Sequence, residues 1–548
     1  MKSSISPQLL FAALAFPVVA GAAGTLGVSP LTHVPSANPK APGLASANAL
    51  SPELIETRVA AGAQLLENPS ALTHHYGYDN NGPLLPIAPN FTVEASKSEP
   101  DKNTYLVLRG QHGADPSYNY GTHFLYQGHE TGTAGYITRI NLDADAAHRV
   151  TLLADHDVAG APLPFIDGSS WYPQANVLLF SGEEGLEGGM WQATPDFPST
   201  VTNLTGIFGI GSYEGIQADV DGNIWVVEDE GGSRGTVNAN ARQPNSFVYR
   251  FVPRNRSNLL AGGVLQALQV RNKANTAPIV FHAGQADADI LSQDQFDLHQ
   301  YRNSFNTAWV TVHDTAVDGF APFNANAAAK TRLATPFKRP ENGQFRPGSA
   351  FREFYFDETG DTDTRTQAGA NYGGFGSVMV LEQSSPSAAT GRLRMIYRGD
   401  VVHTGFDNVA FWSDSQVVFT EDAGDTLHTQ RNALDSMYML DVRADYSNAA
   451  NQPVRIYAEG RDASATLDSA LLGQSGFQNS GDNEITGIHI SDGDATVFGL
   501  LGFKRPRPFV NGWRVFYTQQ HGDNTTWEIL PRGRNNDFDD RRLLGNYN

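Results

Sequence analysis

The chain of 548 residues carries 58 acidic and 38 basic residues, so its formal net charge is −20. This acidic balance argues against a nucleic-acid-binding protein, which needs a basic surface. With 54 Gly, 30 Pro and 40% hydrophobic residues, the composition is that of a turn-rich globular protein, neither disordered nor fibrous. The sequence has no Cys, which excludes disulfides, thiolate metal ligands and cysteine nucleophiles.

The first 23 residues have the features of an export signal. Lys2 precedes an apolar run over residues 9–19, and small residues follow at 20–23. Such a segment predicts a Sec-type signal peptide and is too short for a membrane anchor. We therefore expect an exported protein, periplasmic or extracellular, with no membrane partner.

Residues 24–100 are expected to form a linker and an N-terminal helical arm. The first part is rich in Ala, Pro, Ser and Gly and has little periodicity. Ser51, Pro52 and Glu53 then resemble a helix cap and first turn, and Leu54, Val59, Leu65 and Leu66 follow at near-helical spacing. This pattern predicts a short helix over residues 51–66.

From residue 101 to residue 548 the sequence reads as one domain of short strands between turns. Apolar, β-branched runs begin at residues 104–110 and recur as far as 526–530. So many short strands exclude a parallel α/β sheet and favour an all-β fold, either a large sandwich or a β-propeller of five or six blades. Long loops are expected to be inserted, for example at residues 235–246, and an amphipathic helix at 287–301.

One arrangement of acids and strands occurs three times in this domain. In residues 213–232, Glu214 precedes a tight Asp221-Gly222 turn, an alternating strand follows, and further acids come after it. Residues 406–425 repeat this order with Asp407 and Glu421, and residues 483–503 repeat it more loosely with Glu484 in front. A radial array of small antiparallel sheets that all send carboxylates to one axis would produce this pattern.

Two further segments carry candidate site residues. Glu183 and Glu184 follow the strand at 176–180 in a glycine-rich turn, where such a pair is usually just exposed. Arg339-Pro340-Glu341 would present a phosphate-matching fork and a metal ligand from one rigid loop, or else an ordinary Arg–Glu ion pair in a turn. Because the candidate ligands are oxygen-rich and include no Cys, they suit a hard cation, above all Ca²⁺.

The order of these motifs resembles the PhoX-type alkaline phosphatases, over about residues 105–530. The segments FLYQGHE, NVLLFSGEEG and YEGIQADVDGNIWVVEDE are similar to early strands of that family, and Tyr213 stands where His is usual. KRPENG resembles its Arg-Pro-Glu-Asp loop, and FDNVAFWSDSQVVFTED resembles a later blade. NEITGIHIS and VFYTQQHGDNTTWEI resemble its closing strands.

The resemblance implies phosphomonoester hydrolysis at iron and calcium ions on a propeller axis. It implies that Glu214 and Glu341 would ligate iron, that Arg339 would hold the phosphoryl group, and that Glu183 and Glu184 would bind calcium. The whole set of expected metal ligands is Glu183, Glu184, Glu214, Glu341, Asp407, Glu421 and Glu484. The family's bridging cysteine is matched here by Gly182, so a thiolate-bridged iron pair cannot form. We therefore expect Ca²⁺ rather than Fe³⁺, or a site that has lost its chemistry.

Three functions remain open from the sequence. The first is an exported, monomeric, metal-dependent phosphoesterase that acts on a small phosphate ester. The second is a calcium-dependent lactonase propeller that would use Glu214, Asp407 and Asn408 and would not need Arg339. The third is a non-catalytic binding propeller whose calcium ions stabilise the axis.

Overall fold

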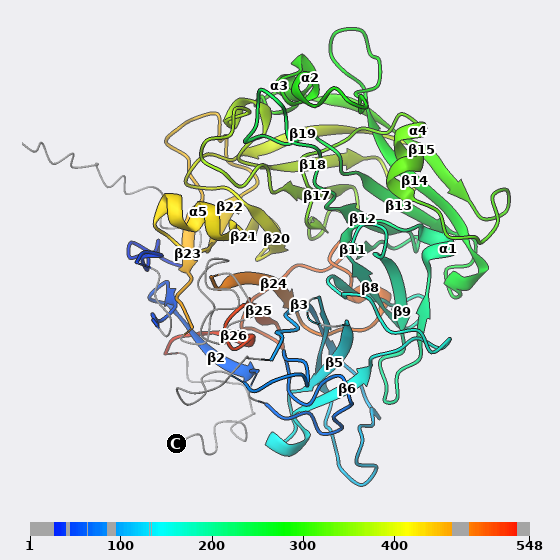
Figure 1. Cartoon of the computed structure of the whole chain (residues 1–548), viewed down its shortest axis with the longest axis vertical. Coiled ribbons are helices and arrows are strands. Elements are labelled where there is room, and N and C mark those ends of the chain that lie inside the picture. Colours follow the sequence, from blue (N-terminus) through cyan, green and yellow to red (C-terminus); the bar gives the residue numbers. More distant parts are fainter. Residues whose placement is uncertain are drawn as a thin grey trace, which may run out of the picture.

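The computed structural model describes residues 27–39, 44–62, 64–84, 95–130, 132, 134–462 and 482–533. The expected signal peptide lies outside these residues. Within them, no helix is both long and apolar enough to cross a membrane. Nearly all the regular structure is β, in small antiparallel sheets around a common centre (Figure 1).

The first two sheets have four strands each and follow the chain order. The first contains β3 (Pro100–Val107), β4 (His123–His129), β5 (Tyr136–Asn141) and β6 (Val150–Ala154). The second contains β7 (Ser169–Tyr172), β8 (Val177–Gly182), β9 (Gly189–Ala193) and β10 (Val201–Asn203).

A nine-stranded sheet then combines two units that are joined at their outer edges. The third unit contains β11 (Tyr213–Ala218), β12 (Ile224–Glu228), β13 (Val248–Pro253), β14 (Gly263–Val270) and β15 (Phe305–Asp314). The fourth contains β16 (Gly343–Phe345), β17 (Glu353–Glu358), β18 (Ser377–Gln383) and β19 (Thr390–Arg398). The join is an antiparallel pairing of β15 with β19.

The last two sheets each take a strand from the N-terminal segment. The fifth unit contains β20 (Phe406–Phe411), β21 (Gln416–Glu421), β22 (Ser436–Asp441), β23 (Val454–Ala458) and β1 (Ala49–Leu50). The sixth contains β24 (Glu484–Ser491), β25 (Arg514–Gln520), β26 (Thr525–Pro531) and β2 (Leu54–Ala60).

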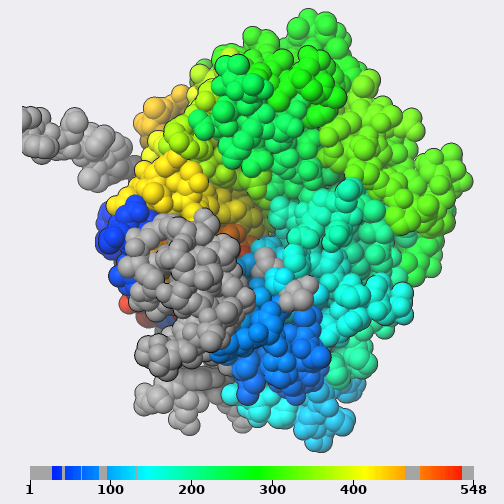
Figure 2. Space-filling model, viewed as in Figure 1, coloured from blue at the N-terminus to red at the C-terminus, as the bar shows by residue number. Residues whose placement is uncertain are grey.

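The innermost strands of the six units form a closed ring. Along the ring β3 contacts β7, then β11, β16, β20 and β24 follow in turn, and β24 contacts β3 again. The space-filling view shows the same order, with the colours following one another around the molecule from blue through cyan and green to yellow (Figure 2). The expectation of an all-β propeller is confirmed, and the described strands resolve into six units.

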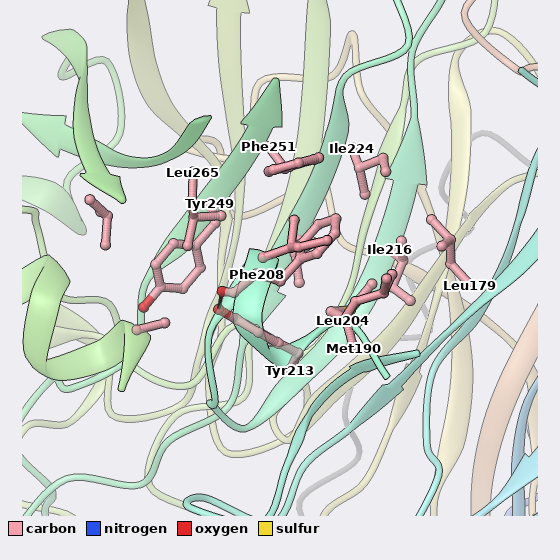
Figure 3. Close-up of a cluster of buried hydrophobic side chains, with 14 of the residues drawn as sticks. Leu179, Met190, Leu204, Phe208, Tyr213, Ile216, Ile224, Tyr249, Phe251 and Leu265 are labelled. Carbon is pink, nitrogen blue, oxygen red and sulfur yellow. Dashed lines mark hydrogen bonds between the residues drawn. The ribbon is translucent and has the colours of Figure 1, made fainter. Parts of the chain in front are cut away.

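Hydrophobic side chains fill the space between neighbouring units. In one cluster, Leu179 and Met190 of the second unit pack with Ile216, Ile224 and Phe251 of the third (Figure 3). Alternate residues of each strand point to the two faces of its sheet, so each sheet can bury apolar side chains on both sides. This packing fixes the inner strands around the axis.

The predicted helix over residues 51–66 is wrong. Leu54–Ala60 is strand β2, which pairs with β26, and β1 pairs with β23. The outer strands β23 and β26 would otherwise present unpaired backbone groups, and the N-terminal segment satisfies them. Tertiary pairing therefore outweighs the local helix-like pattern.

The few helices lie in the connections between strands. They are α1 (Thr205–Phe208), α2 (Ala286–Ile290), α3 (Gln293–Leu298), α4 (Ala325–Thr331) and α5 (Gly424–Arg431). The single helix predicted over 287–301 is instead the pair α2 and α3. The first ends at Ile290, and Ser292 caps the second by accepting from the Gln295 N–H. Residues 235–246 form the long loop that the sequence predicted.

Candidate metal centre

Each of the six inner strands brings a carboxylate to the same end of the axis. Apart from the added strands β1 and β2, each unit begins with its inner strand, and an acid lies within the first two residues of that strand or two residues before it. These acids are Asp101, Asp167, Glu214, Glu341, Asp407 and Glu484. Because the inner strands form one ring, their first residues converge around the axis.

Local irregularities in the strands help to aim these side chains. β3, β11 and β20 each shift their pairing register at this end, and Asp101, Glu214 and Asp407 lie within the shifts. A β-bulge turns a side chain away from the normal alternation and is common beside functional sites. The bulges therefore direct acids to the axis rather than between the sheets.

The second strands of the first three units supply a further set of acids. Glu130, Glu183 and Asp229 each follow directly after β4, β8 or β12. In an antiparallel hairpin the second strand ends where the first begins. These acids therefore lie at the same end of the propeller as the first set.

Four overlapping groups of carboxylates have their ligand atoms within 4.8 Å of one another. They are Asp101–Glu130–Asp167, Asp167–Glu183–Glu214, Glu183–Asp229–Glu341 and Glu214–Glu341–Asp407. Because neighbouring groups share members, the eight acids form one continuous cluster, which we call the axial acid cluster. A separate group, Asp425–His428–Asp482, lies at α5.

The electrostatics of the axial acid cluster favour bound cations. Burial raises the pKa of Asp167, Glu183, Glu214, Glu341 and Asp407 well above the usual range, and the negative charges of their neighbours add to this. Both carboxylate oxygens of Asp167 are buried and make no hydrogen bond within the described part of the chain. A multivalent cation would hold such acids ionised and complete their contacts, and an all-oxygen donor set fits Ca²⁺.

The structure brings four of the seven predicted metal ligands together: Glu183, Glu214, Glu341 and Asp407. The other three lie outside these groups. Glu484 stands at the edge of the cluster and pairs with His521 at 3.3 Å. Glu421 is buried in an ion pair with Arg431 at 2.8 Å, and Glu184 is exposed.

Arg339 is held beside the cluster by two acids. Its Nε donates to Asp229 Oδ1 and Oδ2 at 2.8 and 2.9 Å, and its Nη2 lies 2.5 Å from Asp229 Oδ2 and 3.3 Å from Glu341 Oε1. The backbone of Arg339 has φ 58°, which is uncommon for a residue with a side chain. Of the guanidinium nitrogens, Nη1 makes no hydrogen bond to any described residue, and the side chain is 23% exposed.

Sequence reasoning missed four acids of the cluster and one buried lysine. Asp101, Glu130, Asp167 and Asp229 stand beside strand ends in the sequence, but ordinary turn acids do so too. Lys102 is 5% exposed and donates to Asn342 Oδ1 among these carboxylates. Its sequence context, Glu-Pro-Asp-Lys-Asn, is that of an exposed turn, so only the arrangement of the inner strands reveals it.

Gly182, at the end of β8, has no space for a side chain. A Cβ at this position would lie 2.7 Å from the Phe165 carbonyl oxygen and 3.2 Å from the Trp191 ring. A thiolate could therefore not be placed here without a backbone shift.

Comparisons with known proteins agree with this architecture. A family model described as "Alkaline phosphatase PhoX" matches residues 223–498. The structure of Pseudomonas fluorescens PhoX in complex with vanadate, a transition state analogue, aligns with a TM-score of 0.50 and 11% sequence identity, over 91% of this chain and 98% of that one. At this identity the likeness shows the fold alone.

Other solved structures are more distant. The α-L-arabinofuranosidase PaAbf62A from Podospora anserina has a TM-score of 0.31 and 8% identity, over 86% of this chain and 99% of that one. Sqt1 from Chaetomium thermophilum has a TM-score of 0.31 and 11% identity, over 74% of this chain and 80% of that one. No curated protein matches the chain.

Proposed function

Because the chain belongs to the PhoX family of alkaline phosphatases, we propose that it is an exported, metal-dependent phosphoesterase that hydrolyses small phosphomonoesters at the axial acid cluster. We further propose that it acts as a monomer and needs neither a nucleic acid nor a membrane as partner. The observation that carries the proposal is the position of Arg339, a cation beside buried carboxylates that are themselves suited to hold cations.

The proposed metal ligands are the eight acids of the cluster. Asp167, Glu183, Glu214 and Glu341 each belong to two of its groups. Ca²⁺ is the ion that this donor set favours, and the iron pair of the family would lack its thiolate. Bound cations supply charge that neutralises phosphoryl oxygens and favours deprotonation of an attacking water.

The protein's own groups would orient the ester. Asp229 holds the Nε and Nη2 edge of Arg339, which fixes the guanidinium plane. Nη1 would then donate to a phosphoryl oxygen and stabilise the negative charge that grows in the transition state. The uncommon backbone conformation of Arg339, followed by the rigid Pro340, keeps this loop in place.

The first test combines metal analysis with turnover of p-nitrophenyl phosphate before and after chelation. We expect bound calcium and hydrolysis that stops on chelation and returns with Ca²⁺. Arg339→Ala should lower kcat about 10²- to 10³-fold, the effect of removing one preorganised donor to a transition-state oxyanion. The matched control is Arg392→Ala, an exposed arginine on the outer strand β19 that donates to Ser304 Oγ at 3.0 Å.

Each alternative gives a different result. A lactonase would cleave lactones but not p-nitrophenyl phosphate, and it would keep its activity in Arg339→Ala. A non-catalytic propeller would bind calcium and hydrolyse neither substrate. Either outcome would overturn the phosphoesterase proposal.

A further inference from the structure

The long loop between β12 and β13 is fastened next to Arg339. Asp287 accepts hydrogen bonds from the backbone N–H groups of Thr236 and Asn238, each at 2.9 Å. Further along, the Asn240 N–H donates to Gln367 Oε1 at 3.1 Å, and the Gln243 side chain donates to Asp289 at 2.6 Å. These anchors come from two other segments of the chain, helix α2 and the loop that contains Gln367, and they hold the loop along its length.

Within this loop, Arg242 is positioned by its backbone. Its N–H donates to Asp361 Oδ1 at 3.0 Å, and its carbonyl accepts from Lys338 Nζ at 3.0 Å. Lys338 directly precedes Arg339 in the chain. The backbone of Arg242 is thus tied to the loop that carries the proposed phosphoryl-binding arginine.

The side chain of Arg242 lies against the segment that follows Asp229. Its Nη1 donates to the Gly232 carbonyl at 3.4 Å, and a Cβ on Gly231 would lie 3.3 Å from the same nitrogen. Arg234 stands opposite, because residues 234 and 242 form an antiparallel bridge. Arg242 therefore lies against the segment that follows Asp229, the acid that holds Arg339, and Arg234 is its neighbour across the bridge.

Neither guanidinium is neutralised within the described part of the chain. Among the described residues, no carboxylate lies within 4.0 Å of the guanidinium nitrogens of Arg234 or Arg242, whereas the Arg339 guanidinium has two acid partners. Burial lowers the pKa of Arg242, the positive charges of Arg234 and Arg339 lower it further, and the negative charges of Asp229 and Asp361 oppose this in part. Two guanidinium groups without an ion-pair partner in the described ranges, next to the Arg339 loop, are a site that an anion would stabilise.

We propose that Arg242, together with Arg234, binds a second phosphoryl group on substrates whose reacting phosphoryl group lies at Arg339. This inference rests on the proposed phosphoesterase function and adds the class of substrate, esters that carry two phosphoryl groups. A planar guanidinium can donate two parallel hydrogen bonds to one phosphoryl group, and the anchored loop holds Arg242 ready to do so.

The test compares fructose 6-phosphate with fructose 1,6-bisphosphate, with release of inorganic phosphate as the readout. In Arg242→Ala we expect KM for the bisphosphate to rise about 10- to 100-fold, as for loss of a charge-assisted contact. KM for the monophosphate should change by about 2-fold or less, because it makes no second contact. Arg242→Lys should recover part of the effect, and Arg392→Ala is the control for loss of a positive charge.

Several results would overturn the inference. One is an equal change of KM for both substrates, and another is no change for either. If Arg242→Ala does not fold, Arg234→Ala gives the same comparison, because among the described residues this exposed side chain makes a single hydrogen bond, to the Ala239 carbonyl.

Failure of the proposed function would look different. If the wild-type protein hydrolyses no phosphate ester, calorimetric binding of the same two sugar phosphates replaces turnover. Tighter binding of the bisphosphate that is lost in Arg242→Ala would then support the second site without the phosphoesterase. Equal affinity for the two sugar phosphates would overturn the proposed second phosphoryl site.

Discussion

Asp219 shows how a single residue in the propeller responds to its surroundings. It lies at the far end of the β11–β12 hairpin from the acid cluster, where Gly222 has φ 87° and closes the turn. Its carboxylate accepts from the Asn223 N–H at 2.9 Å and from Trp225 Nε1 at 2.9 Å. In the turn predicted at Asp221-Gly222, the Asp221 carboxylate accepts from Ser387 Oγ at 2.6 Å, and Asp219 is the acid that accepts from the turn's backbone.

The stability of the protein should depend on pH through Asp219. Burial raises its pKa to about 6, whereas an unfolded aspartate has a pKa of about 3.9. The folded state therefore holds this proton more tightly, so the free energy of unfolding falls as pH rises from about 4 to 6 and is constant above that. The change is roughly 3 kcal/mol, at about 1.4 kcal/mol for each pKa unit.

Urea unfolding at pH 4, 5 and 6 would measure this contribution as the difference in the free energy of unfolding between wild type and Asp219→Asn. We expect the advantage of wild type over the variant to shrink as pH rises, because asparagine does not titrate. A difference that is independent of pH would contradict the assignment.

Gly182 gives a second prediction for a single residue. Gly182→Cys should not create the family's metal-bridging cysteine but should destabilise the protein by about 1–3 kcal/mol, because its Cβ would meet the Phe165 carbonyl. Gly182→Ala makes the same clash without a thiol and should lower the free energy of unfolding by about as much. A stable Gly182→Cys protein with newly bound iron would show that the site accepts the thiolate after all.

At the scale of elements, the N-terminal strands close the propeller. β1 and β2 add to the outer edges of the fifth and sixth units, although more than 390 residues separate them from their partner strands β23 and β26. In β2 the side chain of Leu54 is 1% exposed and packs in the core, whereas that of Ile55 is 37% exposed. This alternation is a strand property that the helix-like spacing concealed.

Leu54→Ala and Ile55→Ala form a matched pair that tests the strand. We expect Leu54→Ala to lower the free energy of unfolding by about 2–5 kcal/mol and Ile55→Ala by less than about 1.5 kcal/mol. Chemical denaturation of both variants measures the difference. Equal losses would indicate that the N-terminal segment does not pair with β26 as described.

At the scale of the whole molecule, the ring of inner strands concentrates negative charge on the axis. Each unit contributes at least one acid to this end, and adjacent units share the ligand groups. The ligand groups take their members from the first five units, so cations that offset the cost of burying these acids should stabilise those units together.

Calcium should therefore raise the free energy of unfolding, by about 2.7 kcal/mol at a concentration 100-fold above Kd. After chelation, stability should fall as pH rises, because the acids with raised pKa values lose protons only at a cost in the folded state. Thermal unfolding with Ca²⁺ and after chelation measures the first effect, and repeating the chelated measurement at several pH values measures the second.

Asp167→Asn should weaken the stabilisation by calcium, and Asp318→Asn, an exposed acid outside the cluster, should leave it unchanged. An identical melting temperature with and without Ca²⁺ would contradict the cation site.

The sequence by itself determined the class of fold and part of the site. Alternating apolar strands between turn residues predict an all-β fold, either a sandwich or a propeller, because side-chain periodicity and turn chemistry are local properties. The repeated acid pattern and the resemblance to the PhoX family favoured the propeller. The recurring acids at strand starts predicted Glu214 and Asp407, and the Arg-Pro-Glu loop predicted Arg339 and Glu341, all of which the structure places at one end of the axis.

Only the tertiary structure decided which other residues join them. Asp101, Asp167 and Lys102 come from segments that resemble exposed turns, and they are buried only because six inner strands close into a ring. In the closed ring, residues 54–60 pair with β26 and form a strand. Arg242, from a loop without periodicity, lies against the loop that carries Arg339. These positions depend on contacts between residues far apart in the chain, which no local pattern encodes.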